Sequence, residues 1–407
     1  MKKLASEGAR PLIDRALPAW PQIPEEGIEA VAAVLRSGRI NYWTGAETRL
    51  FEAEFSAAHE GASALAVSSG TLALELALRS FGVGAGDEVI VPSRTFIATA
   101  GAVVAVGATP VIADIDPTTG ALTPLSVARR LSPRTRAVIV VHVGGYPAPV
   151  AGIRALCEQL DVVVIEDCAQ AQGARAGGRP VGLAGHAACF SFCQDKILPL
   201  GEGGMIVYPS GSAAFEVAAA WRDHGHRLSV DTQVQERRSQ FRYLSDSFGT
   251  NARMTEAQGA LGRVLLAKVP AWHKLRTRNA RVLTEGLSGF APVLRPCVPA
   301  DDTGEHAFYR HYFLLDSAAL AAGWDRDRVI DAISAEGAPV QFGACALIGR
   351  EKAFATLGVT PTPESELPGA LCAAEQSLAF FVHPTLSEDD LGEIAQAARK
   401  VLEAAIA

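Results

Sequence analysis

The sequence predicts an α/β protein: a mostly parallel central sheet with helices on both faces, followed by a smaller C-terminal α+β domain. Between about residues 60 and 210, short apolar runs alternate with amphipathic stretches of helical period. The apolar runs lack the polar alternation of half-exposed strands, so their sheet is expected to be buried on both faces. Regular alternation of strand and helix indicates parallel pairing.

The first strand and helix show the two patterns most clearly. SALAVS (63–68) is short and continuously apolar, as expected of a buried strand. GTLALELALRSFG (70–82) has leucines and alanines at helical spacing, so a helix follows. By the same criteria, further strands are expected at 87–92, 109–115, 135–145, 162–167, 187–195 and 203–209. Further helices are expected at 95–107, near 124–131 and at 150–161.

After about residue 255 the pattern changes to longer helices with few strands. Residues 254–289 predict two helices with Pro270 between them. A strand at 306–316 and helices at 325–337 and 387–407 complete this part. We therefore expect three parts: an N-terminal segment, 1–25, that packs on the small domain or on a partner; a large α/β domain, 26–260; and a small α+β domain, 261–407.

Composition narrows the class of protein. The chain of 407 residues is long enough for more than one core, and its net charge of −7 argues against nucleic acid as a main partner. Neither a transmembrane run nor the apolar core of a secretory signal is apparent. Seven scattered cysteines without zinc-like spacing indicate reduced thiols, no metal site and a cytoplasmic protein.

Polar residues follow several of the predicted strands. Because ligands of parallel α/β sheets bind at the carboxyl ends of the strands, these residues are candidates for a site. Taken singly, each has an ordinary explanation, such as a helix cap, a core aromatic or a surface charge. The candidates are Ser69-Gly70-Thr71 at a helix start, Phe96, Asp167, Gln170, Ser191 and Lys196.

Taken together, the candidates suit one cofactor chemistry. A helix N-terminus with hydroxyls can hold a phosphate, and Phe96 can stack on a flat ring. Asp167 can pair with a protonated ring nitrogen. A lysine among apolar neighbours is more easily neutral and therefore nucleophilic, which suits Lys196. These properties point to pyridoxal 5'-phosphate (PLP), held as a Schiff base.

The same stretches carry a family resemblance. The sequence resembles the DegT-type nucleotide-sugar aminotransferases, within the fold-type I PLP-dependent enzymes. The resemblance covers most of residues 25–270, in order, and the spacing of Asp, SF-x3-K and GEGG is its most specific part. The matching motifs are SSGTLALELAL (68–78), GDEVIVPSRTFIATAGAV (86–103), IEDCAQAQGA (165–174), SFCQDKILPLGEGGMI (191–206), DHGH (223–226) and SFGTNARMTEAQGALGRVLL (247–266).

The resemblance implies a role for each candidate. Lys196 would form the Schiff base and move protons, and Asp167 would pair with the pyridine nitrogen. The site would be shared across a homodimer. The remaining roles implied are contact with the phenolic oxygen for Gln170, ring stacking for Phe96, phosphate binding for Gly70, Thr71 and Ser191, and contact with the neighbouring subunit's phosphate for Asn251.

The activity implied is transfer of an amino group, with pyridoxamine 5'-phosphate (PMP) as the intermediate form of the cofactor. The donor would be an amino acid, L-glutamate first, and the acceptor a nucleotide-linked keto-deoxysugar of surface-polysaccharide or secondary-metabolite biosynthesis. One alternative is a PMP-dependent sugar dehydratase or deoxygenase, although Lys196 argues against the dehydratases that carry histidine there. The other is a PLP-binding regulator without turnover. We expect structural roles for the histidines in motif-like positions, which are His142, His224, His226 and His383. If one of them assists proton transfer or sugar binding, His224 and His383 are the first choices.

Overall fold

Seven strands form the large sheet of the computed structural model, which describes residues 3–226, 245–298, 304–345, 347–358 and 361–406. Their order across the sheet is β1-β9-β8-β5-β4-β2-β3. The five strands from β8 to β3 pair in parallel, whereas β9 is antiparallel to both β8 and β1. The strands are β1 (Ser63–Val67), β2 (Glu88–Pro92), β3 (Thr109–Ala113), β4 (Thr135–Val141), β5 (Val163–Asp167), β8 (Ala187–Ser191) and β9 (Gly204–Tyr208).

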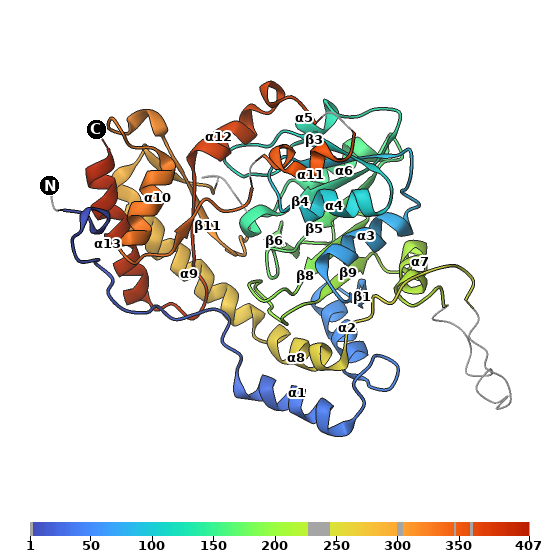
Figure 1. Cartoon of the computed structure of the whole chain (residues 1–407). Helices are drawn as coiled ribbons and strands as arrows, with labels where there is room; N and C mark the ends of the chain where they lie inside the picture. Colours follow the sequence, from blue (N-terminus) through green and yellow to red (C-terminus); the bar gives the residue numbers. More distant parts are fainter. Residues whose placement is uncertain (1–2, 227–244, 299–303, 346, 359–360, 407) are drawn as a thin grey trace.

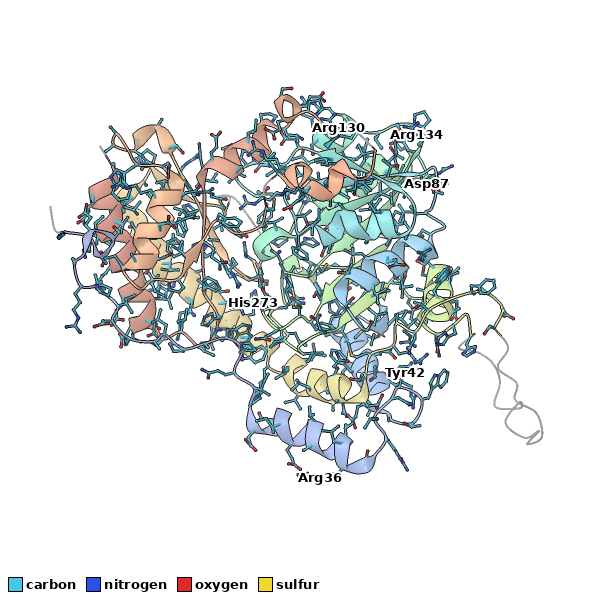
Figure 2. The ribbon with its side chains drawn as sticks, in the orientation of Figure 1. Arg36, Tyr42, Asp87, Arg130, Arg134 and His273 are labelled. Carbon is cyan, nitrogen blue, oxygen red and sulfur yellow. The ribbon has the colours of Figure 1, made fainter. Side chains whose placement is uncertain are left out.

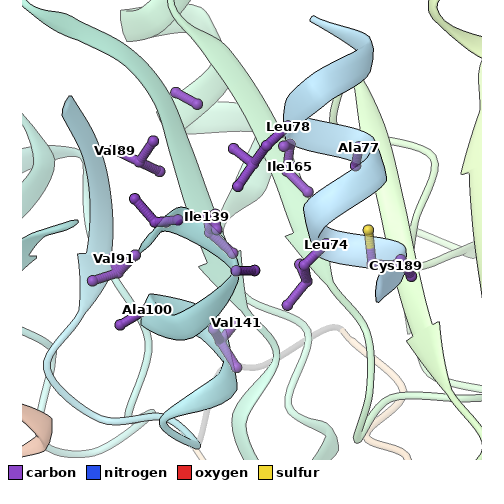
Figure 3. Close-up of a cluster of buried hydrophobic side chains, with 14 of the residues drawn as sticks. Leu74, Ala77, Leu78, Val89, Val91, Ala100, Ile139, Val141, Ile165 and Cys189 are labelled. Atoms are coloured by element: carbon purple, nitrogen blue, oxygen red, sulfur yellow. The ribbon is translucent and has the colours of Figure 1, made fainter. Parts of the chain in front are cut away.

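Helices cover both faces of this sheet, as the uninterrupted apolar runs require (Figure 1). On one face, Leu74 and Leu78 of α3 (Gly70–Ser80) pack with Ile139 and Ile165 of the central strands (Figure 3). On the other face, Ile153 of α6 (Val150–Glu158) is buried in a separate apolar cluster. Each such side chain contributes roughly 1.5–3 kcal/mol by leaving water. The fold class predicted from the sequence is confirmed.

The remaining helices of the large domain surround the sheet or extend from it. In Figure 1, α1 lies at the lower edge of the molecule, where it packs against α8. Tyr42, in the segment between α1 and α2, lies under the Arg222 guanidinium at 4.3 Å (Figure 2). These helices are α1 (Glu25–Ser37), α2 (Glu47–Ala58), α4 (Ala98–Ala105), α5 (Pro124–Ala128), α7 (Ala213–Arg222) and α8 (Glu256–Leu266).

Some element boundaries differ from those expected. The predicted strand 135–145 ends at Val141, because Gly144 and Gly145 adopt positive φ angles of 65° and 96° and turn the chain. The predicted strand 187–195 ends at Ser191, which leaves Lys196 in a turn. Pro270 does not separate two helices; it lies in the first turn of α9 (Val269–Leu287), where its missing N–H costs nothing.

A second, antiparallel sheet forms the core of the C-terminal part, in the order β10-β11-β13-β12. Phe313 and Phe380 pack edge to face at 5.7 Å in an apolar cluster that α9, α10 and α13 complete. Its elements are β10 (Leu294–Pro296), β11 (His311–Leu315), β12 (Val340–Gln341), β13 (Ser377–Phe380), α10 (Arg326–Ala335), α11 (Lys352–Ala355), α12 (Pro368–Gln376) and α13 (Glu388–Ala405). A short hairpin, β6 (Arg175–Ala176) with β7 (Arg179–Pro180), stands apart from both sheets.

The N-terminal segment before α1 lies along the C-terminal part of the chain (Figure 1). The Glu336 carboxylate accepts hydrogen bonds from the backbone N–H groups of Ala5 and Leu12, at 2.8 and 3.0 Å. Trp20 packs edge to face on Trp272 of α9 at 5.1 Å. The division at residues 25 and 260 stays a prediction. Among the described helices, none has both the length and the apolar character that crossing a membrane requires.

Candidate active site

The site residues gather where strands β2, β5 and β8 end and α3 begins. Ser69 caps α3, because its Oγ accepts a hydrogen bond from Leu72 N at 3.2 Å. A Cβ built on Gly70 would lie 2.6 Å from Ser191 Cβ, so the first turn of α3 and the end of β8 touch. Thr71 is exposed beside them. A helix start with unpaired N–H groups and adjacent hydroxyls forms a cradle for an anion such as phosphate.

Asp167 ends β5 and is 6% exposed. Its Oδ2 accepts a hydrogen bond from Thr99 Oγ1 and its Oδ1 one from Ala169 N, both at 3.1 Å. Burial raises the pKa of this carboxyl, while the Ala169 N–H, the Thr99 hydroxyl and the positive charge of Lys196 oppose that rise. A buried carboxylate in this state is stabilised by a further cation placed against it, such as a protonated ring nitrogen.

Lys196 follows β8 in a turn whose backbone is held by hydrogen bonds. Its N–H donates to Cys193 O at 3.0 Å, and its carbonyl accepts from the indole N–H of Trp20 at 3.0 Å. The side chain is 16% exposed, and Ile197 and Leu198 next to it are buried. Because the charge of Lys196 acts on the pKa of Asp167, the two groups lie within electrostatic reach of each other.

The aromatic ring of Phe96 and the amide of Gln170 complete the site. Phe96 is 69% exposed, although it lies in a loop that is held by the Thr95 N to Cys345 O hydrogen bond at 3.1 Å. An exposed ring on a tied loop is a surface on which a flat ligand can stack. Gln170 Oε1 accepts a hydrogen bond from Gly144 N at 2.7 Å, which orients its amide and leaves the NH2 group as a donor.

Asn251 is exposed and lies beside the end of β1. The carbonyl of the next residue, Ala252, accepts a hydrogen bond from Ser68 N at 2.9 Å. The backbone of Asn251 forms an isolated antiparallel β-bridge with Asp223. Asn251 is thereby near the start of α3, yet no hydrogen bond from it to Gly70 or Ser191 is found among the described residues. The structure brings Gly70, Thr71 and Ser191 together and couples Asp167 with Lys196. The roles of all eight candidates stay predictions.

PLP fits these residues. The anion cradle at α3, the exposed Phe96 ring, the buried Asp167 carboxylate and the Lys196 amine match its phosphate, ring, ring nitrogen and aldehyde. A metal ion has less support. His142, Glu166 and Cys168 lie close together, but the Glu166 carboxylate already accepts from His142 and from the N–H groups of Gly182, Ala184 and Gly185. His142 Nδ1 accepts from Ala148 N, so this cluster is satisfied without an ion.

The other histidines of interest have separate environments. His383 is buried, bonds Thr385 Oγ1 at 2.8 Å and stacks beside Trp20 at 6.3 Å. Burial, assisted by the charges of Arg276 and Arg310, lowers the pKa of His383 to about 4, so the ring is neutral at pH 7. His224 is exposed with a φ of 56°, and its N–H donates to Thr250 O at 3.1 Å.

Several residues at the site have no distinguishing motif in the sequence. Thr99 lies one turn after Phe96 and resembles any small residue of an apolar helix. Gln172 donates to Ser191 O at 2.6 Å, and Trp20 reaches Lys196 from a segment without strand or helix pattern. Tyr309 lies beside Lys196 although 113 positions separate them in the chain. Only the folded arrangement of the chain brings Trp20 and Tyr309 to the lysine.

Comparison with known proteins identifies related chains over nearly the whole length. The sequence profile of the DegT/DnrJ/EryC1/StrS aminotransferase family matches residues 21–399. The dTDP-3-amino-3,4,6-trideoxy-alpha-D-glucose transaminase of Streptomyces venezuelae is 36% identical over 386 residues, covering 95% of this chain and 94% of the relative. The L-glutamine:2-deoxy-scyllo-inosose aminotransferase of Streptomyces kanamyceticus is 33% identical, with 98% and 97% covered.

Solved structures agree with the sequence matches. The X-ray structure of the aminotransferase from Psychrobacter cryohalolentis superposes with a TM-score of 0.91 at 40% identity, covering 96% of this chain and 99% of that chain. A Streptococcus pneumoniae protein, 24% and 23% identical in two structures, has the same fold with TM-scores of 0.85 and 0.83. Those two structures are described as its PMP form and its PLP form.

Proposed function

Because this chain belongs to the DegT/DnrJ/EryC1/StrS aminotransferase family, we propose that it transfers an amino group from an amino acid to a keto-sugar with PLP as cofactor. The acceptor proposed is a nucleotide-linked keto-deoxysugar. The donor proposed is L-glutamate, with L-glutamine as the competing candidate, since the Streptomyces kanamyceticus relative is named for L-glutamine and a cyclitol ketone. The Streptomyces venezuelae relative, named for a dTDP-sugar, supports the nucleotide-linked acceptor.

The observation that carries this proposal is that Asp167 ends β5 and Lys196 follows the neighbouring parallel strand β8, beside the anion cradle of α3. When bound, PLP supplies an aldehyde that bonds to amines and a protonated ring that withdraws electrons from the adjoining carbon. The N–H groups and hydroxyls at Gly70, Thr71 and Ser191 would hold its phosphate. Phe96 would cover one ring face, and Asp167 would keep the ring nitrogen protonated, because its buried charge is stabilised by that proton.

Lys196 then acts as the general acid and base of the reaction. Its amine would take the proton from Cα of the donor amino acid and deliver one to C4′ of the cofactor, and in the second half-reaction it would reverse these transfers. The low exposure of the side chain excludes most water from Nζ, which limits exchange of that proton with solvent. Gln170 would donate its NH2 group to the phenolic oxygen of the ring.

A homodimer is part of the proposal. Phe248, three residues before Asn251, is 92% exposed, and the outer face of α1 exposes Ile28 and Leu35. In Figure 2, Arg36 projects from the side of α1 that faces away from α8. Apolar side chains this exposed are usual at protein interfaces. We propose that two subunits pair through these exposed apolar side chains, so that Asn251 of one subunit approaches the phosphate site of the other.

The proposal is tested by following the transfer of the amino group from donor to acceptor. The PLP-loaded protein would be incubated with L-glutamate or L-glutamine, and the spectrum of the cofactor recorded before nucleotide-linked 3-keto and 4-keto sugars and inososes are added. Mass spectrometry distinguishes gain of an amino group from loss of water, the outcome expected of a dehydratase. Lys196→Ala is the control. Turnover by Lys196→Ala, or no spectral change with any donor, would refute the proposed activity.

A further inference from the structure

Two side chains outside the predicted site contact the amine of Lys196. Nζ lies 4.7 Å from the centroid of the Tyr309 ring, over its face, and 4.0 Å from Oδ1 of Asp195. The Tyr309 hydroxyl donates a hydrogen bond to the other carboxylate oxygen of Asp195, Oδ2. The ring face and the carboxylate are therefore joined into one unit, the Tyr309–Asp195 pair, against the lysine.

The chemistry of this pair suits an ammonium group. Burial raises the pKa of Tyr309 well above its usual value, so the phenol stays neutral and its hydroxyl keeps the proton that it donates in the hydrogen bond to Asp195. A neutral aromatic face attracts a cation through its quadrupole, and the attraction increases when water is excluded. The carboxylate adds a charge of opposite sign at 4.0 Å, close enough to attract an ammonium group.

The pair is also held in place without Lys196. Arg310 lies over the Tyr309 ring at 4.2 Å, and its Nη2 is 3.7 Å from Asp195 Oδ2. Arg310 is in turn fixed by the ring of Phe381 at 4.1 Å and by a hydrogen bond to Tyr309 O at 3.0 Å. Removing Lys196 from the pair would thus leave the ring and the carboxylate where they are.

We propose that the Tyr309–Asp195 pair is a holding site for the ammonium group of Lys196 while this lysine is not bonded to the cofactor. The inference rests on the proposed function, because a transaminase lysine must leave the cofactor when the donor amine takes its place and must bond to it again later. A protonated lysine among apolar residues would otherwise turn toward solvent. Tyr309 and Asp195 are positioning residues, which act on the reaction through Lys196.

The direct test uses the cofactor-free protein and therefore does not depend on turnover. Lys196 and the exposed Lys352 would be labelled with a limiting amount of acetic anhydride and their acetylation rates compared by mass spectrometry. A held ammonium presents little free amine, so Lys196 should react slowly in the wild type. Tyr309→Leu should raise its rate relative to Lys352 by about fivefold, the effect of losing one cation–π contact. Asp195→Asn should raise it by a similar factor.

Matched variants keep the test independent of folding. Tyr309→Phe retains the ring face and should stay closer to the wild-type rate than Tyr309→Leu. Asp195 is 51% exposed, so Asp195→Asn should fold normally even if Tyr309→Leu does not. Asp327→Asn, an exposed carboxylate on α10, should leave the rate unchanged. Acetylation of Lys196 at the wild-type rate in both Asp195→Asn and a folded Tyr309→Leu would overturn the proposal.

Kinetics separate this inference from the proposed function. If both hold, borohydride should still trap PLP on Lys196 in every variant, while Tyr309→Leu lowers kcat by about fivefold with KM for the donor unchanged, and Tyr309→Phe restores most of it. If the wild type itself shows no trapping or turnover, the proposed function fails while the acetylation result still stands. Unchanged kcat in a folded Tyr309→Leu would contradict the holding site alone.

Discussion

Replacing Gly70 by alanine tests the anion cradle at α3 most sharply. The added Cβ would lie 2.6 Å from Ser191 Cβ, 3.0 Å from its Oγ and 3.1 Å from its Cα. Carbon atoms in contact are normally about 3.5–4.0 Å apart, so the helix start and the end of β8 must separate by about 1 Å. Overpacking of this kind costs about 1–3 kcal/mol, of which the better helix propensity of alanine returns at most about 1 kcal/mol.

We therefore expect Gly70→Ala to lower the free energy of unfolding by about 1 kcal/mol and to weaken PLP binding by about tenfold or more, since both walls of the cradle shift. Urea unfolding of the cofactor-free protein and titration with PLP measure the two effects separately. Gly101→Ala is the matched control, because an alanine there, in α4, meets no atom within 4 Å. That variant should be more stable by about 0.5–1 kcal/mol and bind PLP normally. If Gly70→Ala behaves like Gly101→Ala in both assays, the cradle is wrongly assigned.

Three further predictions follow from the site. Asp167→Asn should still bond PLP at Lys196 but lose about 100-fold or more in kcat, because the ring nitrogen loses its partner; wild-type kcat would contradict that role. Phe96→Ala should change stability by less than about 0.5 kcal/mol, since the ring is exposed, yet weaken PLP binding about tenfold; equal affinity would exclude stacking. His383 has a pKa of about 4 in the folded state and about 6.5 when unfolded, so its contribution is complete above pH 6.5 and is lost as the pH falls toward 4. Between pH 7 and 5 this should cost the cofactor-free protein about 2 kcal/mol in urea unfolding, and His383→Gln should reduce that pH dependence.

The large sheet was predictable because its strands are buried on both faces. Runs such as Val89–Val91 and Val163–Ile165 can bury their apolar side chains only between two layers of helices. The sequence shows a helical pattern before and after each of these runs. The strand β9 was expected at 203–209 and β11 within 306–316, but the antiparallel direction of β9 was not predicted. Strands β10, β12 and β13 were not predicted, because runs of two to four residues carry little periodicity.

The candidate site was predictable where function requires a residue type at a strand end. Asp167 ends β5 and Lys196 follows β8, and neighbouring parallel strands bring their ends together. Tyr309 and Trp20 come from segments that contact the Lys196 turn only after the second sheet and the N-terminal segment have packed. Asp195 could be read from the sequence, but its partner could not, because the hydrogen bond from Tyr309 spans 114 positions.

The most direct measurement is borohydride reduction of the PLP-loaded protein, followed by mass spectrometry of the peptide that carries Lys196. We expect one pyridoxyl group per chain on that lysine, none in Lys196→Ala, and loss of the adduct in wild type when an amino donor is added before the reductant. Labelling at another lysine, or equal labelling of Lys196→Ala, would contradict the assignment of this amine as the cofactor's anchor.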